Sequence, residues 1–396
     1  MKIPKMIYLD HQATTPLDPE VLEAMRPYLG EYFGNPHSAE HMVGWRASQA
    51  VDRATDEVAT LIGADADEII FTSGATEANN LALLGVVGRA NHGARNRVLI
   101  AATEHKCVLE LGRVLERRFA IKVTILPVGR DGVVDLEVLS AELGEDVLLV
   151  SIMAVNNEIG TLQDISKIAQ MTSQFGCLFH CDAAQGPCAM DMSQLAKVAD
   201  LVSLSAHKMY GPMGIGALYI RRELQGSVEP LIYGGGQQNG LRSGTLPTAL
   251  CVGMGRAAKI ASNENAAIER ASVRQLRDLL LDKLLKLPCS TWVNGPRNMQ
   301  FRHPGNINIG FSGVQAADLL GRIQPHLAAS TGSACTSGIP EPSHVLRAIG
   351  LSDEEAAASI RLSIGKNITE DEIETTVSVF EGAIEKIFSD ETSILP

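Results

Sequence analysis

The sequence predicts an α/β fold with a mainly parallel central sheet, and a smaller α+β unit in the C-terminal third of the chain. Short β-rich runs alternate with helical stretches from about residue 67 to residue 220. Several of these runs are continuously apolar, which is typical of strands covered by helices on both faces. The 396 residues exceed what one hydrophobic core usually organises, so a second, smaller domain is expected.

The strands of the expected sheet are short runs at 68–71, 98–101, 123–126, 147–153, 178–181, 201–204 and 216–220. Before them, Asp18 and Pro19 form the start signal of a helix that Gly30 closes, and a second helix is expected from about 40 to 62. These two helices belong to the scaffold.

The smaller unit follows a long helical stretch that runs from 247 to 287. It is expected to contain strands at 306–311 and 360–364, a helix near Asp318, and a last helix announced by a capping box at 369–372. We therefore predict two domains. The large α/β domain comprises residues 15–262, and the small α+β domain comprises residues 1–14 and 263–396.

Charge and hydropathy exclude several classes of function. The net charge is −12, with 46 acidic residues against 34 lysines and arginines and no basic stripe, so direct nucleic-acid binding is not expected. The first residues lack the apolar run and cleavage site of a signal peptide. Because the longest apolar stretch, 147–155, is less than half a membrane span, we expect a cytoplasmic protein without a transmembrane helix.

The seven cysteines are odd in number and include no C-x-x-C pair, which argues against a disulfide framework and against a zinc site. Cys177 and Cys181, with His180 beside them, could suggest a metal. No second ligand pair follows at finger-like spacing, so no metal is expected.

The segment 71–80 reads as a strand, a turn of small residues and a helix that begins near Thr76. Backbone N–H groups at such a helix start, together with the Thr76 hydroxyl, can bind a phosphate. The G-x-x-x-x-G-K pattern of a Walker loop is missing. An ordinary capped helix is the alternative interpretation.

Lys208 follows the predicted strand 201–204 and precedes a glycine-rich turn. The carboxyl edge of the sheet is where α/β proteins bind ligands. A desolvated lysine there can form a Schiff base with an aldehyde cofactor, and Ser205 and His207 could bind that cofactor's phosphate. A lysine at a strand end without a function is the alternative.

Asp182 and Gln185 follow the strand 178–181, and His105 follows the strand 98–101. Pyridoxal 5′-phosphate (PLP) acts as an electron sink only while its pyridine nitrogen is protonated, and a buried carboxylate such as Asp182 can hold that proton. Gln185 could donate to the phenolic oxygen of the ring. The imidazole of His105 could stack on the ring and move protons, although a buried structural histidine is the alternative.

Cys335 lies at the centre of the small, polar and flexible segment 330–338. A reactive thiol needs exposure and mobility, whereas structural cysteines usually lie in apolar runs. We therefore expect Cys335 to be the reactive cysteine. The other six lie in apolar, alanine-rich or helical contexts, or beside Pro288, and are interpreted as inert.

Taken together, these segments resemble the cysteine desulfurases among the class V, fold-type I PLP enzymes, in the branch typified by the nitrogen-fixation and iron–sulfur-cluster enzymes. The resemblance covers nearly the whole chain and implies the PLP-dependent transferase fold of type I. It includes the ordered segments 8–16 (YLDHQATTP), 33–38 (FGNPHS), 72–80 (TSGATEANN), 155–160 (VNNEIG), 182–185 (DAAQ), 205–208 (SAHK), 242–247 (RSGTLP) and 332–337 (GSACTS).

The resemblance implies a set of site residues. The implied catalytic residues are Lys208, Cys335 and His105. The implied PLP ligands hold its ring and phosphate, with Thr245 reaching the phosphate from the neighbouring subunit of a homodimer: Ala75, Thr76, Asn156, Asp182, Gln185, Ser205, His207, Lys208 and Thr245. The implied ligands of the substrate carboxylate are Asn35, Asn156 and Arg361.

The implied reaction converts L-cysteine to L-alanine. The Cys335 thiolate would attack the substrate sulfur, keep it as a persulfide and pass it to an acceptor protein. Ala184, Ala206 and Thr331 depart from the Thr, Gly and Ser expected in the family. The chain also lacks the longer tail with which housekeeping members dock the cluster scaffold, so iron–sulfur cluster assembly, tRNA thiolation and DNA phosphorothioation all stay open as the destination of the sulfur.

Two kinds of alternative function compete with this interpretation. Another class V enzyme, such as a selenocysteine lyase, an aminotransferase or a C–S lyase, would not need a thiol like that of Cys335 in such a segment. A non-catalytic binding module is disfavoured because Lys208, Asp182, His105 and Cys335 occur together.

Overall fold

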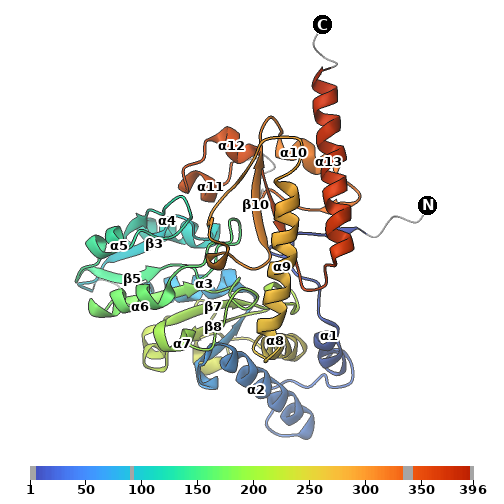
Figure 1. Cartoon of the computed structure of the whole chain (residues 1–396). Helices are drawn as coiled ribbons and strands as arrows, with labels where there is room; N and C mark the ends of the chain where they lie inside the picture. Colours follow the sequence, from blue (N-terminus) through green and yellow to red (C-terminus); the bar gives the residue numbers. More distant parts are fainter. Residues whose placement is uncertain (1–5, 90–92, 333–341, 393–396) are drawn as a thin grey trace.

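A seven-stranded sheet organises the larger part of the molecule, for which the computed structural model describes residues 6–89, 93–332 and 342–392 (Figure 1). β8 pairs antiparallel with β2 and β7, and the other neighbouring strands are parallel. The predicted α/β class with a mainly parallel sheet is thus confirmed. In spatial order the strands are β2 (Ile69–Thr72), β8 (Gly216–Ile220), β7 (Leu201–Ser205), β6 (Leu178–Asp182), β5 (Val147–Ser151), β3 (Arg97–Ala101) and β4 (Lys122–Leu126).

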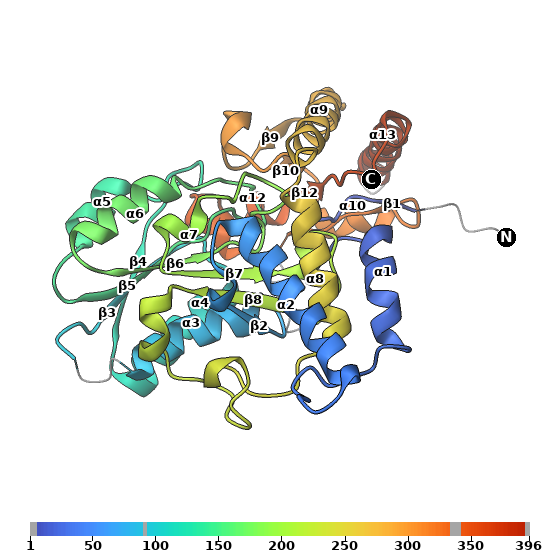
Figure 2. The ribbon, with the colours of Figure 1, turned by 90° about the horizontal axis from the view of Figure 1, so that it is seen from below.

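Helices cover both faces of this sheet, which explains why most of its strands are apolar throughout. α3 (Ala75–Arg89) and α4 (Lys106–Phe119) pack on one face. α2 (Met42–Ile62), α6 (Ile165–Gln174) and α8 (Thr248–Ala261) pack on the other, and Figure 2 shows the strands between the two layers. Strands β2, β3, β5, β6 and β7 run in the same direction, so their carboxyl ends lie at one edge of the sheet.

A second, smaller core lies beside the large sheet (Figure 1). Its antiparallel sheet has the order β12 (Ser359–Ser363), β10 (Asn306–Phe311) and β9 (Thr291–Val293), and it packs against α9 (Ala266–Leu284) and α13 (Glu370–Thr392). The start of the chain joins this core, because β1 (Ile7–Tyr8) pairs in parallel with β11 (Leu327–Ala328). The predicted domain boundaries at 14/15 and 262/263 stay predictions.

The remaining helices are short connections around these two cores. They are α1 (Pro19–Met25), α5 (Leu136–Glu142), α7 (Leu195–Val198), α10 (Ala316–Arg322), α11 (His344–Ala348) and α12 (Asp353–Ala357). No helix among the described residues has the length and apolar character needed to cross a bilayer.

The helical stretch expected from 247 to 287 consists of two helices, α8 and α9, with a break between them. The break is stabilised by Asn263, whose Oδ1 accepts hydrogen bonds from the N–H groups of Asn265 and Ala266 at 2.9 and 3.0 Å. Asparagine side chains often compete with the helix backbone in this way. The two helices belong to different cores, so the break redirects the chain from one to the other.

Candidate active site

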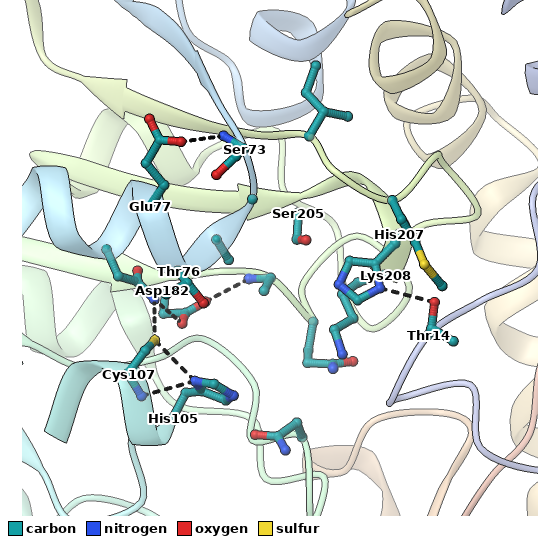
Figure 3. Close-up of a pocket in the computed structure, with 18 of the residues that line it drawn as sticks. Thr14, Ser73, Thr76, Glu77, His105, Cys107, Asp182, Ser205, His207 and Lys208 are labelled. Atoms are coloured by element: carbon teal, nitrogen blue, oxygen red, sulfur yellow. Dashed lines mark hydrogen bonds between the residues drawn. The ribbon is translucent and has the colours of Figure 1, made fainter. Parts of the chain in front are cut away.

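A cavity of about 560 Å³ opens at the carboxyl edge of the large sheet. Strands β6 and β7 end at its wall and helices α3 and α4 begin there, so polar side chains from distant segments meet in one place (Figure 3). The residues predicted from the sequence that line it are Ala75, Thr76, His105, Asp182, Gln185, Ser205, His207 and Lys208.

Lys208 lies in a 3₁₀ turn, Ala206–Lys208, directly after β7. Its Nζ donates hydrogen bonds to the carbonyl oxygens of Gln12 and Ala13 at 2.7 and 2.6 Å. Among the described residues no carboxylate forms an ion pair with it. Burial, followed by the positive charge of Arg361, lowers the pKa of Lys208 to about 8. An amine with this pKa is deprotonated, and therefore nucleophilic, in about a tenth of the molecules at pH 7, far more than an ordinary lysine.

Asp182 is the last residue of β6 and is buried at the wall of the same cavity. Its Oδ2 accepts a hydrogen bond from Asn79 Nδ2 at 2.8 Å, and its Oδ1 accepts one from the Ala184 N–H at 3.0 Å. No described cationic side chain forms an ion pair with it. Since a buried carboxylate is costly without a positive partner, Asp182 is suited to a cationic group that enters the cavity.

The start of α3 forms a site for an anion opposite Lys208. The first N–H groups of a helix have no acceptor within the helix, and here they belong to Ala75 and Thr76, which line the cavity. Gly74 precedes them with a φ of +152°, and a Cβ at this position would meet no atom of the described residues within 4 Å. The glycine therefore lets the turn form and keeps the anion site open.

Ser205 and His207 reach this space from the end of β7. His207 Nδ1 lies 3.0 Å from the Thr14 hydroxyl. Burial, followed by the charge of Lys208, lowers the pKa of His207 to about 4, so the ring is neutral at pH 7 and acts as a hydrogen-bonding group.

His105 caps α4, with Nδ1 accepting a hydrogen bond from the Cys107 N–H at 3.2 Å. The ring is exposed to the space of the cavity, while the protein around it lowers its pKa, with burial as the largest cause. Gln185 is buried nearby, and its Nε2 donates to the Gln12 carbonyl at 2.9 Å. Since an amide nitrogen carries two hydrogens, Gln185 keeps one for a ligand.

Asn156 does not line the cavity, although its neighbour Asn157 does. Its side chain is buried and holds the local turn: Oδ1 accepts from the N–H groups of Glu158 and Ile159 at 2.8 and 2.9 Å, and Nδ2 donates to the Thr103 carbonyl at 2.9 Å. The structure thus gives Asn156 a structural position beside the site.

Arg361 lies on β12, in the smaller core's sheet, and is also outside the cavity wall. Its Nη2 pairs with Asp10 Oδ1 at 2.5 Å and donates to Ser330 Oγ at 3.0 Å. Its Nη1 donates to the Asn157 carbonyl at 2.8 Å. Nη1 also donates to the Gly332 carbonyl at 3.5 Å, and the fifth N–H, on Nε, is buried and has no partner among the described residues, so it is available to donate to a carboxylate oxygen.

Asn35 and Thr245 are exposed and do not line the cavity. Thr245 was predicted to act on the site of a neighbouring subunit, for which an exposed position is required. Cys335 lies outside the described residues. The flanking Ser343 is anchored through a hydrogen bond of 2.5 Å from its Oγ to Glu158 Oε2.

Asn79 and Cys107 also line the cavity, although neither residue is predicted there from the sequence. Asn79 is buried three residues after Thr76 on α3, and Cys107 follows His105 by two residues and lines the cavity. The spacing of Asn79 from Thr76 was a usable signal, because residues three apart share a helix face. Burial raises the pKa of the Cys107 thiol to about 11, which agrees with its interpretation as a poor nucleophile.

Comparisons with known proteins agree with this geometry. Residues 7–376 match the family model "Aminotransferase class-V". The chain is 46% identical over 381 residues to the cysteine desulfurase IscS of Rickettsia bellii, which covers 96% of this chain and 92% of the relative.

Two solved structures have the same fold. A NifS-like protein superposes with a TM-score of 0.89 at 33% identity, over 96% of this chain and 99% of that one. The structure of SspA in complex with cysteine superposes with a TM-score of 0.80 at 34% identity, over 92% of this chain and 100% of that one. Because the family match and the relatives span nearly the whole chain, this protein belongs to the class-V aminotransferase family, in the group that contains the cysteine desulfurases.

Proposed function

We propose that this protein is a cysteine desulfurase that releases L-alanine from L-cysteine and keeps the sulfur as a persulfide on Cys335. The proposal rests on two groups at the wall of one cavity: a half-buried lysine of lowered pKa, and a buried carboxylate that has no cationic partner among the described residues. The cysteine desulfurase relatives and the cysteine complex of SspA support the choice of substrate.

Membership of this family implies PLP, and the residues of the cavity fit that cofactor. We propose that Lys208 bonds to its aldehyde carbon and that Asp182 faces its pyridine nitrogen. Gln185 would donate to its phenolic oxygen, and His105 would stack on its ring. The phosphate would lie against the open space at Gly74, held by Ala75, Thr76, Ser205 and His207, with Asn156 supporting the wall. Bound there, PLP supplies an electron sink for the carbon skeleton of the substrate.

The chain's own groups would then carry the proton and sulfur steps. The Lys208 amine would take and return a proton at the substrate Cα. The Cys335 thiolate attacks the substrate sulfur, so an S–S bond forms while the C–S bond breaks. The electron pair of the broken bond stays on carbon, which is protonated to give alanine, and the persulfide passes to an acceptor protein.

We propose that Arg361 binds the substrate carboxylate through its Nε–H, which has no partner among the described residues, with Asn35 as a second ligand and Asn156 holding the adjoining turn. Asp10 would keep the guanidinium in place through the opposite edge. A guanidinium that is fixed by an ion pair through one nitrogen can still donate a hydrogen bond from another nitrogen, and can therefore bind an amino-acid carboxylate.

We further propose a homodimer, in which Thr245 completes the phosphate site of the neighbouring subunit. Large apolar side chains are exposed around the loop before α2 and near Thr245, as expected for a surface covered by a second copy: Leu29, Phe33, Met42, Trp45 and Tyr233. A cytoplasmic location and the two-domain division at 14/15 and 262/263 are part of the same proposal. Iron–sulfur assembly, tRNA thiolation and DNA phosphorothioation are the candidate destinations of the sulfur.

The test is to incubate the PLP-loaded protein with L-cysteine, measure alanine and locate bound sulfur by peptide mass. Extra sulfur is expected on the peptide that contains Cys335. Cys335→Ser should bind PLP and L-cysteine yet form no persulfide, because a hydroxyl is far less acidic than a thiol and cannot replace the attacking thiolate. Undiminished alanine release by this variant, or sulfur on Cys181 or Cys107, would overturn the proposal.

A further inference from the structure

A continuous set of hydrogen bonds joins the buried carboxylate of Asp182 to the imidazole of His105 (Figure 3). Asn79, fully buried on α3, donates from Nδ2 to Asp182 Oδ2 at 2.8 Å and to Cys107 Sγ at 3.3 Å. Cys107 Sγ in turn lies 3.0 Å from His105 Nδ1. Two side chains that the proposed chemistry does not use thus link two that it does.

The direction of these bonds follows from the chemistry of the groups. The Asn79 amide nitrogen can only donate, so Cys107 Sγ is the acceptor and its own hydrogen is free to point to His105 Nδ1. This arrangement needs a protonated thiol. Burial, followed by the negative charge of Asp182, raises the pKa of Cys107 to about 11, which keeps the thiol protonated at pH 7.

The backbone settles the state of His105 Nδ1. The Cys107 N–H donates to the same nitrogen at 3.2 Å. A backbone N–H can only donate a hydrogen bond and cannot accept one. A proton on Nδ1 would face two donors. The neutral ring therefore carries its proton on Nε2.

The charged groups around the ring act in both directions. Asp182 and Glu158 raise the pKa of His105, while Lys208 and His344 lower it. Burial is the largest cause and the pKa is lowered overall, so the neutral form is favoured.

We propose that Cys107 and Asn79 are positioning residues that hold the His105 imidazole in one orientation, with its proton on Nε2, and connect it to Asp182. For turnover, the inference rests on the proposed function of His105 and Asp182. It goes further in stating what His105 offers the cavity, which is an N–H donor rather than a lone pair. A ring held in this way keeps one tautomer while its Nε2–H donates to a bound group or its face stacks on that group.

The direct test is nitrogen NMR of the protein with ¹⁵N-labelled histidine, recorded with and without PLP. The chain has ten histidines, and the signals of residue 105 are those that a His105→Gln variant loses. In the wild type Nδ1 should have the chemical shift of an unprotonated nitrogen and Nε2 that of a protonated one. A protonated Nδ1 at neutral pH would overturn the inference.

The variants test the two side chains. Cys107→Ala should raise the titration midpoint of His105 by about half a pH unit or more, because Nδ1 loses a donor, while Cys107→Ser should restore the wild-type midpoint. Asn79→Leu, of similar volume, should produce a smaller shift in the same direction. Cys289→Ala is the matched control. Cys289 packs against the smaller core, so this substitution should leave the titration midpoint of His105 unchanged. An unchanged midpoint in Cys107→Ala, or a serine variant that behaves like the alanine variant, would refute a hydrogen-bonding role.

Kinetics separate positioning from simple loss of structure. Cys107→Ala in the PLP-loaded enzyme should lower kcat roughly tenfold with an unchanged KM for L-cysteine, and Cys107→Ser should recover most of that loss. A rise in KM with kcat unchanged would contradict the inference. The NMR experiment requires no turnover, so a wild type that releases no alanine would refute the proposed function and leave this inference to be decided by the spectra.

Discussion

The two sides of the site differ in how their polar groups are used. On the side of the large sheet, Lys208 and Asp182 stand at strand ends and face a cavity, with hydrogen bonds to neighbours but no ion pair among the described residues. On the side of the smaller core, Arg361 is paired with Asp10 and bonded to Ser330, and its Nε alone lacks a partner in the described part of the chain. The side of the large sheet can therefore bind a large charged group, whereas the side of the smaller core can add one hydrogen bond to a small ligand.

This contrast predicts that substitutions on the two sides will have different measurable effects. Changes on the sheet side should affect the retention and spectrum of PLP together with turnover. Changes at Arg361 should affect the affinity for L-cysteine and leave PLP in place. Variants at Lys208, Asp182 and Arg361 can break this separation.

Lys208→Ala should abolish turnover and remove the visible absorbance of the PLP linkage, while circular dichroism shows an intact fold. The residue is at a wall and not in a core, so its loss should cost little stability. Alanine release from L-cysteine is the measurement. Release at the wild-type rate would exclude Lys208 from the chemistry.

Asp182→Asn should keep the volume of the side chain and lose its charge. We expect a shifted PLP spectrum and a fall in kcat of roughly a hundredfold or more, because the pyridine nitrogen would lose the carboxylate that favours its protonated form. Asp200→Asn is the control, since Asp200 is also a largely buried carboxylate but lies before β7, at the opposite edge of the sheet. Equal spectra and rates in the wild type and Asp182→Asn would remove Asp182 from the site.

Arg361→Lys should raise the KM for L-cysteine by roughly tenfold or more, because an ammonium cannot hold Asp10 and a substrate carboxylate in one planar arrangement. PLP content and the PLP spectrum should stay those of the wild type. Steady-state kinetics and the absorbance of the purified variant give both readouts. Loss of PLP from this variant would break the separation between the two sides.

The smallest expected effect concerns pH. The pKa of Lys208 is lowered to about 8, so the fraction of neutral amine in the PLP-free protein rises through that pH and levels off about one unit above it. The rate at which the PLP-free protein takes up PLP should therefore increase about tenfold from pH 7 to its plateau near pH 9. A rate that keeps rising toward pH 10.5 would mean that Lys208 is as basic as an exposed lysine.

The same pKa has a consequence for stability in the PLP-free protein. Between about pH 8 and the ordinary lysine value, the unfolded chain binds a proton at residue 208 that the folded chain does not. Stability from this group therefore increases as pH rises through that window. Denaturant midpoints of the wild type and Lys208→Met, compared at pH 8 and pH 10, measure the difference.

The sheet side of the site could be predicted from sequence because a strand end determines where the next residue lies. Asp182, Ser205 and Lys208 directly follow apolar runs, and parallel strands bring their ends to one edge. The position of Arg361 against Asp10 could not be predicted in this way, because it depends on two segments 351 residues apart. Such contacts are set by the packing of the smaller core, which no local pattern describes.

Local patterns also failed where a polar side chain interrupts a helix or completes a network. The sequence from 247 to 287 has helical periodicity throughout, yet Asn263 ends one helix and starts another. Cys107 was interpreted as inert from its helical context, and its position in the cavity wall became visible only once α3 and α4 were placed side by side. In both cases a hydrogen bond, and not the spacing of apolar residues, determines the local structure.

The carbonyl of Gln12 accepts hydrogen bonds from both Lys208 and Gln185, and the segment that carries it continues from a strand of the smaller core. The segment that contains Gln12 therefore helps to hold two side chains of the candidate site in place. Trimming residues 6–14, or attaching a rigid fusion immediately before them, would act as an active-site mutation, whereas a flexible extension attached ahead of residue 6 would leave the lysine's two carbonyl acceptors in place. Engineering of this protein for immobilisation or tethering should begin from that distinction.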